Sequence, residues 1–265
     1  AGQYDLFLSL HHGSAPLLMP NAWDRGSAVL LASLGFEAVA TTSSGFAATL
    51  GRLDGSVTLD EALEHSAVIA GAVGLPVSAD LENGFADDPD GVAGTVRLAA
   101  GTGLAGCSVE DSTGRDGDPI YEPALAAERV AAAAEAARGR LVLTARAENF
   151  LYGRRDLTDT ITRLQAYQAA GADVLYAPGL TELADIREVV RSVDRPVNVL
   201  ALAGAPEVSE LAEAGVRRIS VGGAFAFAAF GALAHAAREL REQGSYGFLA
   251  TARDGQNAVR AAFGR

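Results

Sequence analysis

Short apolar segments alternate with longer segments of helical period along the whole chain. Four of the apolar segments follow a glycine that would end a helix, within residues 34–43, 102–111, 170–179 and 214–223. Three more open on Pro16, Pro76 and Pro196, and one begins at Leu141. Proline is tolerated as the first residue of a strand, because the ladder does not yet need its missing N–H. The pattern therefore predicts eight short strands.

The segments between these strands read as helices rich in alanine. Thr58 and Glu61 form the pattern of a capping box, and residues 122–139 run from a glutamate to a glycine stop. Strands that alternate with helices pair in parallel, and eight such units in a chain of this length indicate a (β/α)8 TIM-type barrel, one domain over residues 1–265. The rival doubly wound sheet lacks a G-x-G-x-x-G after its first strand.

Composition narrows the possible partners. Hydrophobic residues make up 49% of the chain and aromatics only 6%, so the core must consist mainly of Ala, Val and Leu. The net charge is −12, and every basic residue is an arginine, which argues against nucleic acid or a membrane as partner. A single cysteine, Cys107, excludes an internal disulfide. Without a signal peptide or an apolar run of membrane length, a cytoplasmic protein is expected.

Polar side chains gather where the predicted strands end, which is where barrels of this type carry their chemistry. Residues two apart in a strand share a face. Ser78 and Asp80 therefore align, together with Glu82 if the extended form continues. The same spacing aligns Ser108 with Glu110, aligns Thr144, Arg146 and Glu148, and leaves Thr42, Ser44, Asn198 and Ser220 at the ends of other strands. A barrel interior built only for packing would carry Val, Ile and Leu at these places.

Two acids at the ends of neighbouring strands, Asp80 and Glu110, repel each other unless a cation lies between them. Mg²⁺ or Mn²⁺ suits such a pair, because these ions take a few carboxylates and fill the other positions with water and substrate oxygen. Zinc is not expected, since no histidine falls at a strand end. The acids around Pro89 (Asp87, Asp88 and Asp90) read instead as the start of the next helix. Asp111 fits either interpretation.

Arg146 projects from the same predicted mouth. It can pair with Glu148 or Glu110, and it can also clamp a substrate carboxylate or a developing enolate oxygen. The two roles are compatible. The segment of residues 41–55 is rich in small residues and offers backbone N–H groups to an anion.

Taken together, these motifs resemble the isocitrate lyase / phosphoenolpyruvate mutase superfamily over nearly the whole chain. The resemblance rests on PNAWDRGSA, TTSSG with LGRLDG, PVSADLENGF, GCSVEDS, LTARAENF and DTITRLQAYQAAGADVLYAPG. It implies a (β/α)8 barrel, a last helix exchanged between subunits in a dimer or tetramer, Mg²⁺, and a small 2-oxo acid that passes through an enolate.

The resemblance also implies roles for individual residues. Asp80 matches the direct metal ligand, while Glu82 and Glu110 match acids that hold the metal largely through water. Arg146 matches the arginine on the substrate. The turn that grips the substrate carboxylate is matched by Ser44, Gly45 and Phe46, and Asp54 matches a further acid near the metal. Asn198 is a further candidate for substrate binding, and Arg146, Glu110 and Asp54 are the candidate catalytic residues.

The chain departs from the lyases in one loop. Where they carry Lys-Lys/Arg-Cys-Gly-His, whose Cys serves as the acid, residues 112–122 read STGRDGDPIYE, with no Cys, Lys or His. Cys107 faces away from Glu110 and cannot replace the missing acid, whereas Arg115 and Asp118 can contribute polar contacts here. We therefore expect a Mg²⁺-dependent lyase or decarboxylase that breaks a C–C bond. Two alternatives stay open, a mutase or hydrolase acting on a C–P bond and a 2-oxo acid binding protein without turnover. The apolar segment from Gly222 suits a subunit contact or packing on its own barrel.

Overall fold

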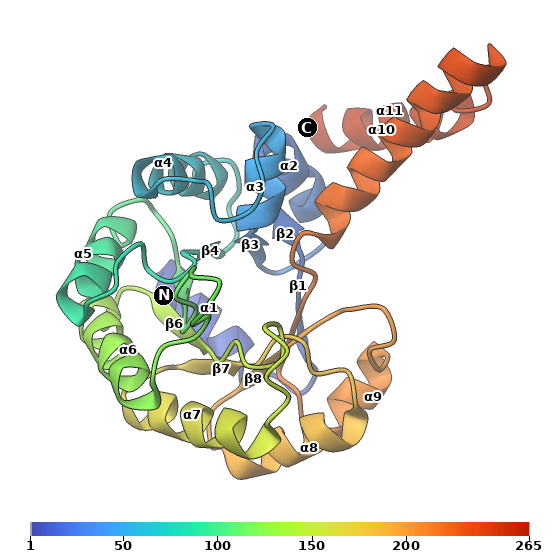
Figure 1. Ribbon diagram of the computed structural model, residues 1–265. Coiled ribbons are helices and arrows are strands. Elements are labelled where there is room, and N and C mark those ends of the chain that lie inside the picture. The colour runs from blue at the N-terminus through green and yellow to red at the C-terminus, as the bar shows by residue number, and fades with distance from the viewer. Residues whose placement is uncertain (1, 265) are drawn as a thin grey trace.

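The computed structural model describes residues 2–264 as a parallel β-barrel surrounded by helices, with a pair of helices projecting from one side (Figure 1). The strands are β1 (Leu17–Met19), β2 (Asn21–Ala22), β3 (Val39–Thr41), β4 (Val77–Asp80), β5 (Gly106–Glu110), β6 (Val142–Arg146), β7 (Val174–Tyr176), β8 (Val197–Leu200) and β9 (Arg218–Ser220). The helices are α1 (Gln3–Leu10), α2 (Arg25–Ser33), α3 (Ser43–Thr49), α4 (Leu59–Ala70), α5 (Pro89–Ala99), α6 (Pro123–Ala137), α7 (Leu157–Ala169), α8 (Leu183–Ser192), α9 (Val208–Glu213), α10 (Ala224–Gln243) and α11 (Leu249–Phe263). The predicted (β/α)8 barrel is thus confirmed.

The barrel closes through a first strand that is broken at Pro20. The ladder runs β1-β9-β8-β7-β6-β5-β4-β3-β2, and β1 and β2 are consecutive pieces of one strand. The sequence predicted a single strand here. Proline has no N–H to donate, which interrupts the ladder, but the Pro20 carbonyl still accepts the Ala40 N–H at 2.9 Å. The ring therefore holds eight strand positions.

Most of the core lies between the barrel and its ring of helices. Outward-facing strand residues such as Cys107 and Leu143 pack there with Val96 and Val130 of the helices, and all of these are buried. Cys107 does face away from Glu110. A second, smaller cluster fills the amino-terminal end of the barrel, where Phe7 of α1 is fully buried. Helix α1 therefore closes the end opposite to the strand carboxyl termini.

Side-chain caps fix where several helices begin. Asp88 accepts the N–H of Gly91 at 2.9 Å, and Pro89 is the first residue of α5, as the sequence predicted. Thr58 and Glu61 form the expected capping box at α4. Thr42 caps α3 by accepting the Gly45 N–H at 3.3 Å. The expected small-residue loop of residues 41–55 is thus wrong in part, because this cap starts a helix at Ser43 directly after β3.

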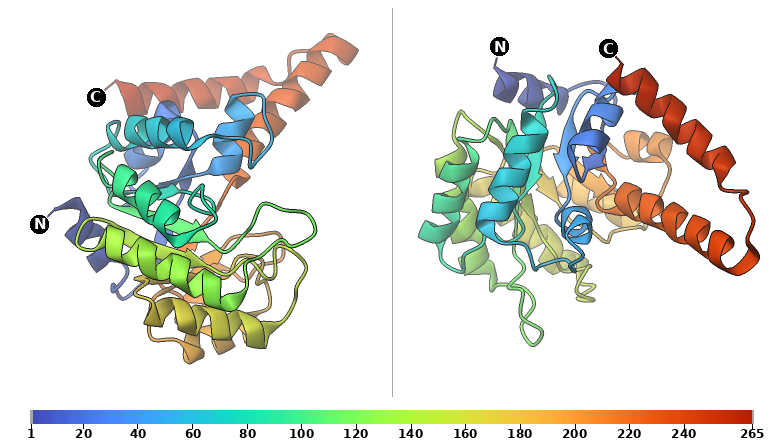
Figure 2. Two further views of the ribbon diagram at one scale, coloured as in Figure 1. Left: turned by 60° about the vertical axis from the view of Figure 1, so that its left-hand side comes forward. Right: turned by 90° about the horizontal axis from the view of Figure 1, so that it is seen from above.

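Helices α10 and α11 form an arm that leaves the barrel and folds back toward α2 (Figures 1 and 2). Several large apolar side chains of α10 are exposed, among them Phe227 and Leu233. Gly244 ends α10 in the left-handed conformation, with φ 65°, and allows the chain to reverse. Within the described residues, no helix is both long and apolar enough to cross a bilayer.

Two glycine-to-alanine changes should shift stability in opposite directions. A Cβ on Gly106, the first residue of β5, would lie 2.6 Å from Phe7 Cε1 and 2.8 Å from the Val142 carbonyl. We expect Gly106→Ala to lower the free energy of unfolding by about 1–3 kcal/mol. Gly94 lies within α5, and a Cβ there meets nothing within 4 Å. Gly94→Ala should therefore raise it by about 0.5–1 kcal/mol. Urea unfolding followed by circular dichroism measures both, and equal shifts would contradict the packing of α1 under β5.

Candidate active site

A cavity of about 980 Å³ opens at the carboxyl ends of the strands and extends down into the barrel. Small inward-facing residues such as Ala40, Ser78 and Ser108 line its inner part and leave the interior hollow. The candidate residues that line it are Ser44, Asp54, Asp80, Glu82, Glu110, Arg146 and Asn198. The alternation of side chains along short parallel strands therefore brings together residues that lie far apart in the sequence.

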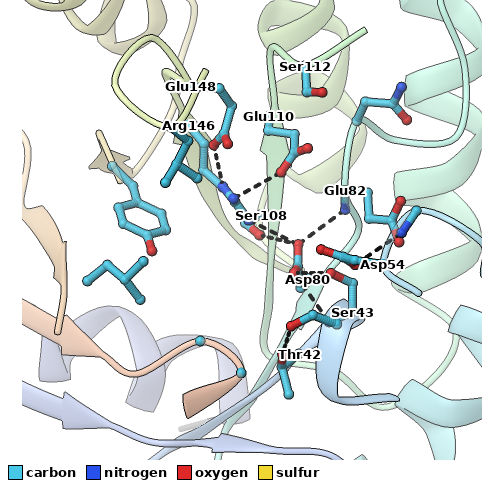
Figure 3. A pocket seen from close by; sticks show the side chains of 18 of the residues that line it. Thr42, Ser43, Asp54, Asp80, Glu82, Ser108, Glu110, Ser112, Arg146 and Glu148 are labelled. Carbon is cyan, nitrogen blue, oxygen red and sulfur yellow. Dashed lines mark hydrogen bonds and ion pairs between the residues drawn. The ribbon is translucent and has the colours of Figure 1, made fainter. Parts of the chain in front are cut away.

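Arg146 lies at the centre of an ion cluster at the mouth (Figure 3). Its Nη1 is 3.2 Å from Asp80 Oδ1, its Nη2 is 3.0 Å from Glu110 Oε2, and its Nε is 2.9 Å from Glu148 Oε1. Burial opposes the charge on Arg146, but Glu110, Glu148 and Asp80 outweigh it and hold its pKa well above the usual value. Burial raises the pKa of Glu110 and of Glu148, against the lowering effect of Arg146. The cluster therefore has more acids than its one cation neutralises.

Asp80 ends β4 and is held from several sides (Figure 3). Its Oδ2 accepts from Ser43 Oγ at 3.0 Å, and its Oδ1 accepts from the Glu82 N–H at 3.2 Å in addition to Arg146. The backbone N–H of Asp80 donates to Thr41 Oγ1 at 2.9 Å. These contacts fix the carboxylate where the ends of β3, β4 and β6 meet.

Glu82 reaches the cavity by a different route from the one expected. The strand ends at Asp80, and Glu82 adopts φ 48°, in the left-handed region. The extended backbone on which the alignment of Glu82 with Asp80 depended is therefore absent, although the Glu82 side chain still lines the cavity. Burial, then Asp80 and Asp54, raise the pKa of Glu82 to about 7.

These oxygen donors suit a hard divalent cation, although they do not form a complete metal site made of protein ligands alone. Among residues 2–264, no group of three His, Cys, Asp or Glu side chains converges as a metal site. Asp80, Glu82 and Asp54 nevertheless line the same cavity, and burial, with a further contribution from Asp80 and Asp54, raises the pKa of Glu82. Mg²⁺ takes one or two carboxylates and keeps water on its other positions. Asp80 suits direct contact, and Glu82 and Glu110 suit contact through water.

The predicted substrate turn is only partly in the cavity. Ser44 lines it, but Gly45 and Phe46 belong to α3 and do not line it. The Gly45 N–H donates to the Thr42 cap, and the Phe46 ring stacks on His65 with centroids 3.7 Å apart. Any contact of this turn with a ligand therefore comes mainly through Ser44.

Asp111, which the sequence left ambiguous, lies behind the site. It is buried, and its Oδ1 accepts the Glu148 N–H at 2.8 Å, while its Oδ2 accepts from Tyr167 Oη at 2.6 Å and from Arg163 Nη1 at 3.1 Å. This network fixes the backbone of Glu148 and thereby one of the partners of Arg146. Asp111 is a supporting residue.

Sequence reasoning missed several polar groups that line the cavity, among them Tyr152 and Arg218. Tyr152 follows β6, and its hydroxyl is 2.9 Å from Ser112 Oγ. No periodicity marks a loop tyrosine. Arg218, the first residue of β9, also lines the cavity. The sequence could have indicated Arg218, because it lies two residues before Ser220 in the same strand and its side chain therefore points to the same face.

A parallel barrel with a polar cavity at the carboxyl ends of its strands has the site at the place where barrel enzymes carry their chemistry. The sequence profile described as phosphoenolpyruvate phosphomutase matches residues 7–241, and the chain belongs to this family, within the isocitrate lyase / phosphoenolpyruvate mutase superfamily. The resemblance stated from the motifs is confirmed.

Three similar proteins illustrate the relatives of this chain. A crystal structure from Burkholderia cenocepacia, provisionally named a lyase/mutase, is 50% identical and superposes with a TM-score of 0.94 over 97% of this chain and 94% of that one. An uncharacterized protein of Mycobacterium tuberculosis is 34% identical over 89% of each chain. The oxaloacetate decarboxylase of Pseudomonas syringae pathovar tomato is 29% identical over 84% of this chain and 79% of its own. Relatives in this family are thus enzymes of several reaction types.

The raised pKa of Glu82 predicts how stability depends on pH. Its folded pKa of about 7 lies above its usual 4.5, so the folded state binds this proton more tightly. The associated stability is complete below about pH 4.5 and is lost as the pH rises through 7. In EDTA, wild type should therefore lose more thermal stability between pH 5 and pH 8 than Glu82→Gln, which has no such proton. Millimolar Mg²⁺ at pH 8 should stabilise wild type more than the variant. Parallel pH curves would contradict the raised pKa of Glu82.

Proposed function

We propose that this protein is a Mg²⁺-dependent enzyme that breaks a C–C bond in a small 2-oxo di-acid or its adduct, as a lyase or decarboxylase. The observation that carries the proposal is the fixed Asp80 carboxylate, aimed into the cavity beside Glu82 and tied to Arg146. The resemblance to an oxaloacetate decarboxylase supports the same class of reaction. Breaking such a bond leaves an electron pair as an enolate, and the site offers fixed charge to hold it.

Mg²⁺, held by Asp80 and through water by Glu82 and Glu110, would supply positive charge beside the developing enolate oxygen. Arg146 orients the substrate and adds a guanidinium that cannot lose its proton. Asp54 lies on the same wall as Glu82 and adds to the negative field that favours a cation. Ser44 contributes a hydroxyl at the edge of the cavity. These roles need no acid from the loop after β5.

The enolate must then be protonated, and the Ser112–Tyr152 hydroxyl pair is the candidate donor. Both side chains line the same cavity as Glu110 and take the place of the missing loop cysteine as a source of a proton. Burial raises the pKa of Tyr152, which keeps its hydroxyl protonated at neutral pH. Tyr152 Oη gives its proton to the enolate carbon, and solvent returns one afterwards.

The C–P alternative has weaker support. A phosphoryl group needs several cationic or N–H donors, and in the loop after β5 the arginine at position 115 already pairs with Asp87 at 3.3 Å. Phosphorus NMR on phosphonopyruvate tests this alternative. For the non-catalytic alternative, the crowded acids count against it, because a simple binder of anions has no use for them.

We also propose that the protein is a homo-oligomer, a dimer or tetramer. The exposed apolar side chains of α10 support this, since soluble monomers rarely expose such patches. Light scattering coupled to size exclusion measures the assembly.

Metal-dependent turnover should require Asp80. Purified protein with Mg²⁺ should release pyruvate from oxaloacetate or a related di-acid above the rate of free Mg²⁺, and EDTA should abolish it. Asp80→Asn should lower kcat/KM at least about a thousandfold, because it removes the direct ligand and its charge. Asp88→Asn is the matched control, since asparagine caps a helix as well as aspartate does. Activity that survives both EDTA and Asp80→Asn would refute the proposal.

Tyr152→Phe should lower kcat about a hundredfold while KM changes little, because proton donation acts on the reaction and not on binding. Ser112→Ala should have a smaller effect, since it removes only the partner of the hydroxyl. Steady-state kinetics with a lactate dehydrogenase couple measures both. An unchanged kcat in Tyr152→Phe would assign protonation to solvent.

A further inference from the structure

Arg218 is a buried cation at the inner end of the cavity. Its side chain is only 2% exposed, yet it lines the cavity together with Asn198 and Ser220. Its Nε donates to Asn198 Oδ1 at 2.9 Å, and its Nη1 lies 3.2 Å from His11 Nε2. His11 Nδ1 faces the Phe7 carbonyl at 2.8 Å and so carries the ring proton, which makes Nε2 the acceptor for Arg218. Both partners of Arg218 are therefore neutral.

The other two buried arginines have partners of a different kind. Arg163 pairs with Asp111 and Asp159, and Arg129 donates to three backbone carbonyls of residues 83–87 and stacks on Tyr121. Among the described residues, no ion pair with an Asp or Glu forms at Arg218. Burial lowers the pKa of Arg218 to about 10, with a contribution from Arg146, so it stays charged at neutral pH. A buried charge without a counter-ion costs several kcal/mol in proteins.

The strand register connects Arg218 with the mouth. Arg146 pairs with Tyr176, Tyr176 with Asn198, and Asn198 with Arg218 in successive ladders. Arg146 ends its strand, whereas Arg218 begins its own, so this row descends from the mouth toward the closed end. The Arg146 guanidinium carbon is 5.2 Å from the Tyr176 ring centre. The two arginines thus border one continuous polar surface inside the barrel.

We propose that Arg218, with Asn198 and Ser220, forms an anion subsite at the inner end of the cavity that binds the second carboxylate of a di-acid substrate. Arg218 has guanidinium N–H groups beyond those used by Asn198 and His11, and a carboxylate would supply its missing counter-charge. Asn198 Nδ2 already donates to Ser220 Oγ at 2.9 Å, which fixes the amide with its oxygen toward Arg218. His11 and Asn198 position the guanidinium. That the bound di-acid is a substrate rests on the proposed function, whereas the anion subsite does not depend on it.

Calorimetry with two matched, unreactive probes tests the subsite. 2-Oxoglutarate and 2-oxopentanoate have the same carbon chain and differ only in the terminal carboxylate. In the presence of Mg²⁺, wild type should bind 2-oxoglutarate between about tenfold and a hundredfold more tightly, as expected for charged hydrogen bonds. Arg218→Gln should lose this preference, and Arg218→Lys should restore part of it. Arg217→Gln is the matched control, because Arg217 is exposed and donates to the Gly13 carbonyl.

Each outcome decides the proposal. Equal loss of both probes in Arg218→Gln, no loss of either, or no preference in wild type would overturn it. If Arg218→Gln does not fold, the Nε–H resonance of Arg218 in the wild-type protein answers the question. That resonance should move on addition of 2-oxoglutarate and not of 2-oxopentanoate, and a static resonance overturns the subsite. Because these readouts are binding measurements, they remain decisive even if no C–C bond is broken, and the proposed function fails separately.

Discussion

The charge of Arg146 is the interaction on which the arrangement of the mouth depends. Three carboxylates, from the ends of β4 and β5 and from the residue two beyond the end of β6, face one guanidinium at 2.9–3.2 Å. The register makes this possible, because Glu110 pairs directly with Arg146 and Asp80 pairs with Ser108 on the strand between them. Without the cation, buried acids at this spacing would repel each other and take up protons instead. Asp111 and Ser43 then hold two of the three partners in place.

The hollow interior depends on the small side chains of the strands. Many barrels of this class fill their centre with large aliphatic residues, but here Ala40, Ser78 and Ser108 line a cavity that continues inward. The stability that such packing would supply comes instead from the layer between barrel and helices and from Phe7 of α1, which is fully buried. The closed end of the barrel is thus apolar around α1, while the cavity above it keeps buried polar groups.

The barrel and the residues at its mouth were predictable from the sequence. The residues that were not predicted depend on turns and on contacts between distant parts of the chain, which local patterns do not encode. Alternation with period two placed Asp80, Glu110 and Arg146 correctly, because each sits within a regular strand. Glu82 departs from that rule, since the backbone turns into the left-handed region directly after Asp80. The loop near Ser44 became a helix because Thr42 caps it. Arg218 followed the rule, but its importance comes from the absence of a charged partner among the described residues, and partners in space cannot be read from spacing along the chain.

Charge is distributed unevenly along the cavity, and this asymmetry orients a ligand. At the mouth, Asp54, Asp80, Glu82, Glu110 and Glu148 outnumber Arg146, so an anion entering alone would be repelled. At the inner end, Arg218 is a cation with neutral partners. A dianion therefore gains most when one end lies near Arg218 and the other meets a divalent cation held by the acids. Metal and dianion should then bind cooperatively, because each removes a repulsion that the other would face alone. In the proposed complex, the acids after β4 would thus act through the metal and Arg218 of β9 on the second carboxylate of the same ligand.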